Sequence, residues 1–565
     1  MTILTCYYQI IHTMHKFLMT CLIAIVALGS AAQDAVFSYF EYTGHDQCFE
    51  KDINPTTEFL NPILAGFYPD PAVCRKGDTY YLVNSSFSFF PGVPIFESKD
   101  LVNWQQIGHV LDRESQLQLQ GQWVSGGIYA PAVSYNEKNE TFYMITTNVG
   151  KGGNFYVKTR DPHQGWSDPI YLPKVDGIDP SFLFDRDGRA YIVHNAPVYG
   201  EAEYEGQRAI RLLEFSVAGD SIVGEPTEIV RGGTHVTEHP IWIEGPHLYH
   251  IGKYYYLMCA EGGTGDGHSE VIFRAKKPQG PWEECPHNPI LTQRNLSDSR
   301  PDKVTSTGHA DLIQTKEGEW WAVFLGCRPY EGGMYNTGRE TFLLPVTWND
   351  GWPQILEKGK AVPTVVEKKG LSVSGETLTG NFSYTDRFDG QTLHRRWLFL
   401  RNPLADAYTL TAKGLTLHPS TGSIKQTKPL SAIFCRQQHI CCTVETELSF
   451  APSSSKRLAG MTVFQDENHH LLFGKTMLNG RPALVLKRVE KEEMLIGSCF
   501  LPDNDTPVRL KIEADGRYYN FYYALGDNTL WQPIAMGVDA SNVSTARSGG
   551  FIGAMIGLYV TKHND

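Results

Sequence analysis

The sequence lacks several features that would place it in common functional classes. It has no CxxC pair and no Cys/His cluster, which argues against a cysteine-bound metal site. Its 50 Lys and Arg against 62 Asp and Glu give a net charge of −12, whereas binding to a phosphate backbone relies on positive charge. After residue 30, almost no stretch repeats apolar residues at helical spacing. These absences disfavour a nucleic-acid partner and a helical fold, and they leave a neutral ligand as the expected partner.

No apolar run is long enough to span a bilayer, which takes about 20 residues. A short run at 17–28 follows a lysine, and small residues precede Gln33. This arrangement predicts a signal peptide over residues 1–32, with Met14 as an alternative start. We therefore expect export to the periplasm or the extracellular space and no membrane span.

The sequence is rich in strand-forming residues and glycine. It has 565 residues, too many for one core, including 28 Tyr, 28 Phe, 11 Trp and 53 Gly. Aromatic residues and tight turns indicate an all-β fold with two or more domains. Removal of the signal peptide leaves nine cysteines, an odd number, so at least one thiol is free or joins two chains. We expect mostly buried free thiols and at most two disulfides.

A motif repeats five times over residues 54–360, and an aromatic strand follows each copy. We call one position of the motif the slot. A Tyr or Trp of the following strand lies 11 to 13 residues after the slot residue. Units of about 45–65 residues with about four short strands are typical of propeller blades. The repeat therefore predicts a five-bladed β-propeller whose first strands bring the slot residues to one end of the central axis. The slot residues are Asp70, Ala130, Asp179, Glu244 and His309.

The segments around the propeller have different patterns. Residues 33–53 lack periodicity and are interpreted as an N-terminal tail or edge segment. Residues 361–384 are rich in Lys, Gly, Ser and Thr and are predicted to be a linker. The alternation over 385–565 predicts a β-sandwich of the concanavalin-like jelly-roll kind. This sandwich is either a carbohydrate-binding module or a structural clamp, and we favour the clamp because no compact set of exposed aromatic residues stands out.

Three of the five slot residues are carboxylates and one is an imidazole. Each Asp-Pro copy alone fits an Asx-type turn, but Ala130 shows that the position also accepts a non-polar residue. Carboxylates held close together cannot all ionise cheaply, so at least one pKa should rise. A pair split into an acid and a base is what cleavage of a glycosidic bond requires. His309 cannot hold a metal alone, and its alternative role is a channel histidine bonded to water or backbone.

These motifs closely resemble glycoside hydrolase family 43, in particular its β-xylosidase and α-L-arabinofuranosidase group. The resemblance covers nearly all of residues 55–565. In the first part it rests on Phe67-Tyr68-Pro69-Asp70-Pro71, Gly177-Ile178-Asp179-Pro180-Ser181, Glu244-Gly245-Pro246-His247 and Gly338-Arg339-Glu340-Thr341. In the second part it rests on Phe388-Asp389-Gly390, Trp397-Leu398-Phe399-Leu400-Arg401-Asn402-Pro403 and Ala459-Gly460-Met461-Thr462.

The resemblance implies an inverting mechanism. In it, Asp70 is the general base, Glu244 is the general acid, and Asp179 raises the pKa of Glu244 and orients it. No cofactor is required, and any calcium would be structural.

The resemblance also implies a sugar-binding role for four residues. Phe87 and Arg339 line the subsite of the terminal sugar, although a core aromatic and a surface ion pair are their alternative roles. His309 lies on the axis, near a bound calcium or a water in some members. Tyr129 stands where close relatives commonly have Trp, so stacking against the sugar is altered there.

The leading hypothesis is an exo-acting hydrolase that removes terminal arabinofuranose or xylose from plant polysaccharides or their oligosaccharides. The substrates would be hemicellulose or arabinan side chains. An endo-arabinanase, which needs an open groove, is a second enzyme hypothesis. A non-catalytic sugar-binding propeller is a third, although such a protein would be expected to lose one of the three carboxylates. The sequence is compatible with both arabinofuranosides and xylosides as substrates.

Overall fold

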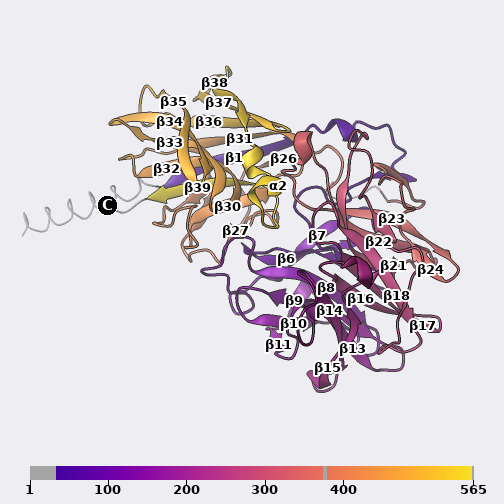
Figure 1. The fold of residues 1–565 in the computed structure, drawn as a ribbon. Helices are drawn as coiled ribbons and strands as arrows, with labels where there is room; N and C mark the ends of the chain where they lie inside the picture. Colours follow the sequence, from indigo (N-terminus) through magenta and orange to yellow (C-terminus); the bar gives the residue numbers. More distant parts are fainter. Residues whose placement is uncertain (1–33, 373–377, 563–565) are drawn as a thin grey trace, which may run out of the picture.

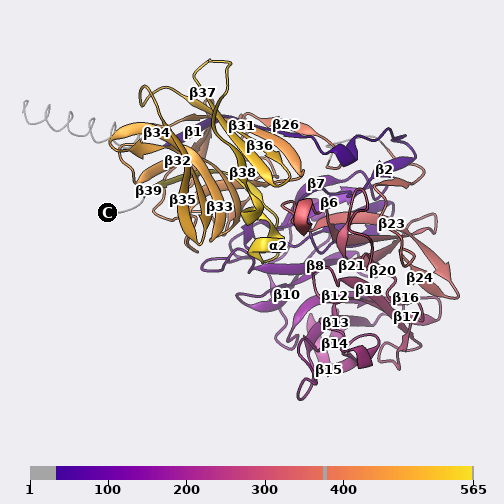
Figure 2. The same cartoon turned by 45° about the horizontal axis from the view of Figure 1, so that its top comes forward.

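The computed structural model describes residues 34–372 and 378–562. They form two β-rich bodies, one coloured mostly orange and yellow and the other purple to pink (Figures 1 and 2). Among these residues the helical elements are the short helix α2 (Thr545–Ser548) and five 3-10 turns. The turns are η1 (Gln47–Phe49), η2 (Pro162–Gln164), η3 (Val236–Glu238), η4 (Glu331–Gly333) and η5 (Ser541–Val543). The all-β prediction is confirmed.

Two further predictions concern the ends of the chain and its thiols. The expected signal peptide, residues 1–32, lies outside the described residues. Within the described part of the chain, no helix is long and apolar enough to cross a membrane. The nine cysteines of that part are all free thiols, and six of them are buried, as expected.

The first body contains five antiparallel sheets, each made of neighbouring strands of the chain. They are β3 (Ala72–Lys76), β4 (Thr79–Val83), β6 (Gly92–Ser98) and β7 (Gln105–Leu111); β8 (Ile128–Asn136), β9 (Thr141–Asn148), β10 (Gly153–Thr159) and β11 (Ile170–Tyr171); β12 (Ile178–Phe184), β13 (Ala190–Pro197), β14 (Arg208–Ser216) and β15 (Ser221–Arg231); β16 (Glu244–Ile251), β17 (Tyr254–Glu261), β18 (Ser269–Ala275), β19 (Glu283–Glu284) and β20 (Leu291–Thr292); and β21 (Thr305–Gln314), β22 (Trp320–Cys327), β23 (Glu340–Asn349) and β24 (Trp352–Gln354). The second strands β9, β13, β17 and β22 are buried along nearly their whole length, so both faces of these sheets are covered.

The first strands of the five sheets meet one another. Strands β3, β8, β12, β16 and β21 are in contact in this order, and β21 returns to β3. A short sheet of β2 (Glu58–Leu60) and β25 (Val365–Glu367) joins the two ends of this region. The prediction of a linker over 361–384 is therefore wrong in part: Val366 is buried with Phe59 in the same hydrophobic core, and that burial holds β25 in place.

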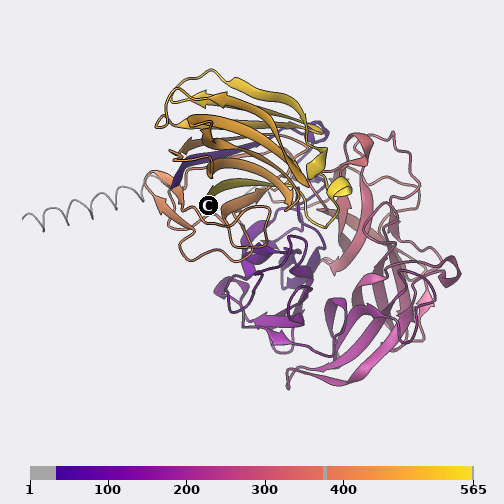
Figure 3. The same ribbon diagram turned by 60° about the vertical axis from the view of Figure 1, so that its left-hand side comes forward.

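The second body is a sandwich of two sheets (Figure 3). One sheet orders its strands β28-β29-β1-β31-β36-β37-β38, with β26 also paired to β1, and the other orders them β30-β39-β32-β33-β34-β35. The first contains β1 (Ala35–Gly44), β26 (Ser383–Asp386), β28 (Tyr408–Thr411), β29 (Gly414–Leu417), β31 (Cys441–Ser449), β36 (Val508–Asp515), β37 (Tyr518–Leu525) and β38 (Gln532–Asp539). The second contains β30 (Ser431–Arg436), β32 (Arg457–Asp466), β33 (His469–Leu478), β34 (Arg481–Glu490), β35 (Glu492–Phe500) and β39 (Met555–Lys562).

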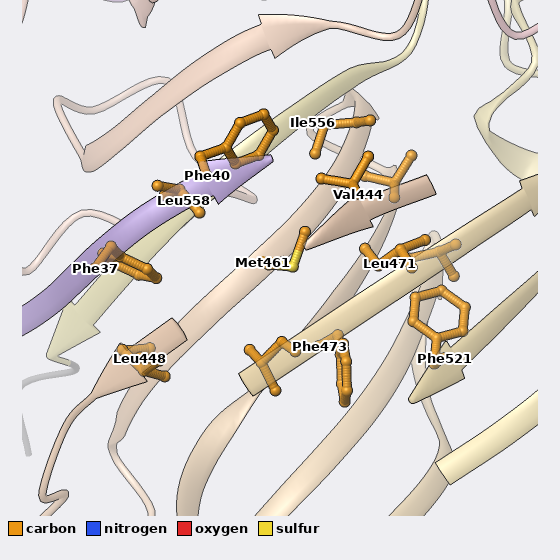
Figure 4. Packing of buried hydrophobic residues seen from close by; sticks show 14 of the residues in the cluster. Phe37, Phe40, Val444, Leu448, Met461, Leu471, Phe473, Phe521, Ile556 and Leu558 are labelled. Carbon is orange, nitrogen blue, oxygen red and sulfur yellow. The ribbon is translucent and has the colours of Figure 1, made fainter. Parts of the chain in front are cut away.

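The N-terminal segment corrects a prediction. Residues 33–53 were expected to be a tail or edge segment, but β1 lies inside the first sandwich sheet, paired with β31 on one side and with β26 and β29 on the other. Phe37 and Phe40 of β1 are fully buried against residues such as Met461 (Figure 4). A register shift between Phe37 and Phe40 breaks the simple alternation. The chain thus begins its described part in the domain where it ends.

Several contacts fasten the two bodies together. Strand β5 (Phe89–Phe90) of the first body pairs with β27 (Phe399–Leu400) of the second. Buried Arg328 binds Asp46 at 2.7 Å (Nη1 to Oδ2) and Glu340 at 2.7 Å (Nε to Oε2). Asp46 also accepts a hydrogen bond from the backbone N of Cys441 at the start of β31. The strand pairing and the buried ion pairs thus join the sandwich and the N-terminal segment to the first body.

Candidate active site

In the first half of each first strand, or just before it, a residue lies in the left-handed region of backbone conformation. The φ values are 51° at Asp70, 37° at Ala130, 56° at Asp179, 55° at Gly245 and 52° at His309. Non-glycine residues with positive φ are uncommon, so four of them and one glycine at equivalent places identify one structural position. In β8, β12, β16 and β21 a β-bulge includes this residue, and bulges re-aim side chains.

This conformation corrects the sequence alignment of the fourth copy. Gly245, not Glu244, occupies the slot, and Glu244 is equivalent to Tyr129 and Ile178, which precede the bulge in β8 and β12. A Cβ atom at Gly245 would lie 2.2 Å from the ring of His309, so no side chain fits there. The fourth copy therefore supplies its carboxylate from the preceding residue.

A cavity of about 460 Å³ opens at this end of the five first strands. All seven predicted site residues line it: Asp70, Phe87, Tyr129, Asp179, Glu244, His309 and Arg339. Ala130, Ile178, Trp242, Gly263, Thr264 and Phe551 complete its wall. Positions spread over most of the first body, together with one residue of the sandwich, thus meet in one pocket.

Asp70 is buried and held by three side chains. Its Oδ1 atom accepts hydrogen bonds from Arg339 Nη1 at 2.8 Å and from His309 Nδ1 at 3.0 Å. Its Oδ2 atom accepts one from Ser85 Oγ at 2.6 Å. Burial by itself raises the pKa of Asp70, but Arg339 and His309 outweigh it and hold that pKa well below its usual value. Asp70 is therefore an ionised carboxylate at neutral pH.

Glu244 has the opposite behaviour. Burial first, and the negative charge of Asp179 second, raise the pKa of Glu244 to about 8. Burial also raises the pKa of Asp179, whose Oδ2 accepts a hydrogen bond from the backbone N of Gly245 at 3.0 Å. This bond fixes Asp179 next to the residue that follows Glu244. At neutral pH, Glu244 therefore keeps its proton.

His309 is hydrogen-bonded to Asp70 and interacts with Asp179 and Glu244 through charge. Burial lowers its pKa, but the hydrogen bond with Asp70 and the charges of Asp70 and Asp179 raise it to about 9. His309 is thus protonated at neutral pH and donates from Nδ1 to Asp70. Among residues 34–372 and 378–562, no group of three or more His, Cys, Asp or Glu side chains is placed to hold a metal ion.

An aromatic wall faces these polar groups. The ring centroids of Phe87 and Tyr129 are 5.0 Å apart, and those of Phe87 and Phe551 are 5.9 Å apart. The guanidinium of Arg339 lies 5.8 Å from the Phe87 ring and 5.6 Å from the Phe551 ring. The Tyr129 hydroxyl donates to the backbone O of Ser125 at 2.7 Å. A cavity that is apolar on one side and densely polar on the other suits a sugar ring, which has both kinds of surface.

Three residues of the site were missed by the sequence reasoning. Ser85 stands two residues before Phe87, but nothing in its spacing connects it to Asp70. Trp242 stands two residues before Glu244, inside the fourth copy of the repeat. Of the three residues, it is the one that the sequence pattern could have indicated. Phe551 follows Gly549 and Gly550 in the sandwich, between α2 and β39. No repeat or spacing marks Phe551, because its place in the cavity depends on how the two bodies pack.

The chain matches known families and proteins over most of its length. Residues 59–353 match the family described as "Glycosyl hydrolases family 43", and residues 385–565 match the "Beta xylosidase C-terminal Concanavalin A-like domain". A "Xylosidase/arabinosidase" of Butyrivibrio fibrisolvens is 38% identical over 523 residues, which cover 89% of this chain and 96% of that protein. The "Non-reducing end alpha-L-arabinofuranosidase BoGH43B" of Bacteroides ovatus is 37% identical over 517 residues, 89% of this chain and 91% of that one.

A solved structure extends the similarity to three dimensions. The crystal structure of "a GH43_12 retrieved from capybara gut metagenome" superposes with a TM-score of 0.87 at 42% identity. It covers 94% of this chain and all of that one. Both bodies of the fold, and their arrangement, are thus shared with it.

Proposed function

The chain belongs to glycosyl hydrolase family 43, and from that premise we propose an exo-acting, inverting glycosidase that releases terminal α-L-arabinofuranose, β-D-xylose or both. Its substrates are plant cell-wall polysaccharides or their oligosaccharides. The relatives that it matches over most of their length are named as a xylosidase/arabinosidase and an arabinofuranosidase. The chain is a glycosidase that hydrolyses O-glycosyl bonds.

We propose that the five sheets of the first body are the blades of a β-propeller, with the cavity at one end of its axis. The contacts of the first strands, which run in chain order and return from β21 to β3, support this arrangement. The proposed catalytic domain covers residues 54–360. The proposed sandwich domain covers 385–565 and includes β1, and it serves as a clamp, as the Arg328 ion pairs and the β5–β27 pairing favour.

The proposed reaction divides acid and base work between two carboxyl groups. Glu244, protonated at neutral pH, donates its proton to the glycosidic oxygen of the leaving group. Asp70, ionised, accepts a proton from the water that attacks the anomeric carbon on the opposite face of the sugar. Asp179 favours the protonated form of Glu244, because a negative charge on Asp179 raises the pKa of Glu244. Arg339 and His309 keep Asp70 ionised and orient it.

The single observation that carries this mechanism is that two carboxyl groups line one cavity in opposite surroundings, Asp70 bound by Arg339 and His309, and Glu244 buried beside Asp179. The pKa of Asp70 is held well below its usual value by Arg339 and His309, whereas burial and Asp179 raise the pKa of Glu244 to about 8. Such a pair identifies an acid and a base.

The reaction uses side chains and water alone, and a calcium ion near His309 stays a prediction. The predicted signal peptide likewise leads us to propose export from the cytoplasm.

Phe551 favours exo-action over endo-arabinanase action. An endo-acting enzyme needs a groove that is open at both ends, whereas Phe551 of the sandwich covers one side of the cavity, against Phe87 and Tyr129. A non-catalytic sugar-binding propeller is disfavoured because Asp70, Asp179 and Glu244 are all present in the cavity.

The proposed function is tested by measuring kcat/KM on aryl β-D-xyloside and aryl α-L-arabinofuranoside. We expect turnover of at least one, and the ratio assigns the sugar. Linear arabinan with its ends blocked is the matched endo substrate. Cleavage of this polymer in preference to both aryl glycosides would overturn the exo assignment.

A further inference from the structure

Trp242 differs from the other aromatic residues of the cavity because it is open to solvent. The residue is 41% exposed, whereas Phe87 is almost completely buried. Trp242 nevertheless belongs to the cavity wall, so it lies at the mouth. Its φ of 53° is in the left-handed region, where a bulky residue is a true outlier. Strain of this kind persists where the surroundings impose it, and it is concentrated at functional sites.

Trp242 is held by one backbone hydrogen bond and by a cation–π contact, and further hydrogen bonds support that contact. Its backbone N donates to Gly206 O at 2.9 Å. The guanidinium of Arg208 lies 5.5 Å from the indole ring and binds Asn195 Oδ1 through Nε at 3.2 Å and Nη2 at 2.7 Å. Asn195 in turn donates to the backbone O of Ile243 at 2.5 Å. Asn195 and Arg208 thus connect the ring of Trp242 to the backbone that leads into Glu244.

The position of Trp242 relative to Glu244 determines which sugar it can meet. The acid must lie beside the glycosidic oxygen, so the leaving group extends from Glu244 toward the open mouth. The terminal sugar occupies the buried end, among Asp70, His309 and Phe87. Trp242 is two residues before Glu244 and on the solvent side. An exposed indole at the mouth of a polar pocket offers a flat apolar face to the next ring.

We propose that Trp242 is the stacking platform for the leaving-group sugar, with Asn195 and Arg208 as its positioning residues. The ligand class is a pyranose or furanose ring bonded to the terminal sugar through the scissile oxygen. This inference rests on the proposed function, and it adds a second subsite. It makes the enzyme select oligosaccharides over glycosides with small leaving groups.

The first test compares leaving groups with and without a sugar. We expect Trp242→Ala to lower kcat/KM on xylobiose or the matching arabinofuranosyl disaccharide by about 10- to 100-fold. On the glycosyl fluoride of the same terminal sugar, whose leaving group has no ring, we expect a change of less than about twofold. Trp242→Phe retains a ring and should stay within about fivefold of wild type on the disaccharide. Equal losses on both substrates, or no loss on either, would overturn the proposal.

A matched control is available in the sandwich. Trp531 also lies under an arginine, with Arg509 at 5.0 Å from its ring, but it is outside the cavity. Trp531→Ala should leave both substrates unchanged, which separates a subsite effect from the general loss of a tryptophan.

A binding measurement keeps the inference separate from the proposed function. In the Glu244→Gln background, calorimetry with the disaccharide and with the free terminal sugar measures the two subsites without turnover. Adding Trp242→Ala should weaken disaccharide binding at least tenfold and leave monosaccharide binding unchanged. Unchanged disaccharide binding refutes the platform, whatever the catalytic activity. If the wild-type enzyme hydrolyses no glycoside but Trp242→Ala still weakens disaccharide binding, the proposed function is refuted and the stacking platform is supported.

Discussion

Two buried clusters of charge in this molecule are built from similar parts and have different consequences. In the cavity, Arg339 binds Asp70 at 2.8 Å. At the junction of the two bodies, Arg328 binds Asp46 and Glu340 at 2.7 Å each. Arg339 and Glu340 are adjacent in sequence and serve different clusters, since successive residues of an extended chain point to opposite sides.

The difference between the clusters lies in what surrounds the carboxyl groups. Glu340 Oε1 accepts hydrogen bonds from Gly66 N at 2.7 Å and from Arg328 Nη2 at 2.9 Å, and its Oε2 also binds Arg328. Glu244 instead faces a cavity, with Asp179 as a like-charged neighbour. Burial raises the pKa of both Glu340 and Glu244, so a raised pKa alone does not mark a reactive group. What distinguishes Glu244 from Glu340 is the open cavity that Glu244 lines.

Replacement of Glu244 should have the largest effect. Glu244→Gln keeps the shape of the side chain but cannot donate the proton, so kcat/KM on a disaccharide should fall by about 10²- to 10⁴-fold. The loss on a dinitrophenyl glycoside should be far smaller, because that leaving group hardly needs protonation. Steady-state kinetics on both substrates measure the difference. Equal damage to both would contradict the role of Glu244 as acid.

Breaking the junction cluster should affect stability and leave chemistry intact. Arg328→Met leaves Asp46 and Glu340 buried without their cation, which costs about 3–5 kcal/mol of unfolding free energy. Denaturant titration measures this loss. The kcat/KM of the folded variant should stay near the wild-type value on every substrate. A selective loss of kcat/KM at unchanged stability would show that the two clusters are not separate.

The pH dependence of activity sharpens the comparison further. Because the acid must be protonated and the pKa of Glu244 is about 8, kcat/KM should fall as pH rises through about 8. The base stays ionised far into the acid range, since the pKa of Asp70 is held below its usual value. Asp179→Asn removes a charge that raises the pKa of Glu244, so the alkaline limb should move to lower pH. An alkaline limb that does not move would remove Asp179 from its modulating role.

The smallest expected effect concerns the aromatic wall. Tyr129→Phe deletes the hydroxyl that donates to Ser125 O, a net loss of about 1 kcal/mol. Since the ring remains, kcat/KM should change by no more than about fivefold, with KM carrying most of the change. A loss as large as that of Glu244→Gln would mean that this hydroxyl takes part in the chemistry.

Much of the site was predictable because the repeat carries it. The slot residues Asp70, Asp179 and His309 follow from spacing alone, and the structure places them in one cavity. The sequence placed Glu244 in the slot, whereas the structure places Gly245 there. The sequence does not reveal that a side chain at position 245 would collide with the His309 ring. The resemblance added Phe87 and Arg339, which no spacing marks.

Contacts between distant parts of the chain were not predictable. Strand β1 pairs with β31, about 400 residues later, and no local pattern announces such a partner. Phe551 enters the cavity because the sandwich packs against the first body, where Phe551 contacts Phe87 and Tyr129. Both depend on tertiary packing, which single-sequence periodicity does not contain.

The stereochemistry of the first product tests the central claim most directly. If Asp70 activates water while Glu244 protonates the leaving oxygen, the anomeric carbon is attacked once and its configuration inverts. Proton NMR recorded in the first minutes of hydrolysis, before mutarotation, should therefore show the sugar with the anomeric configuration opposite to that of the substrate. Retention of the substrate's configuration would require a covalent intermediate and would contradict the role of Asp70 as base.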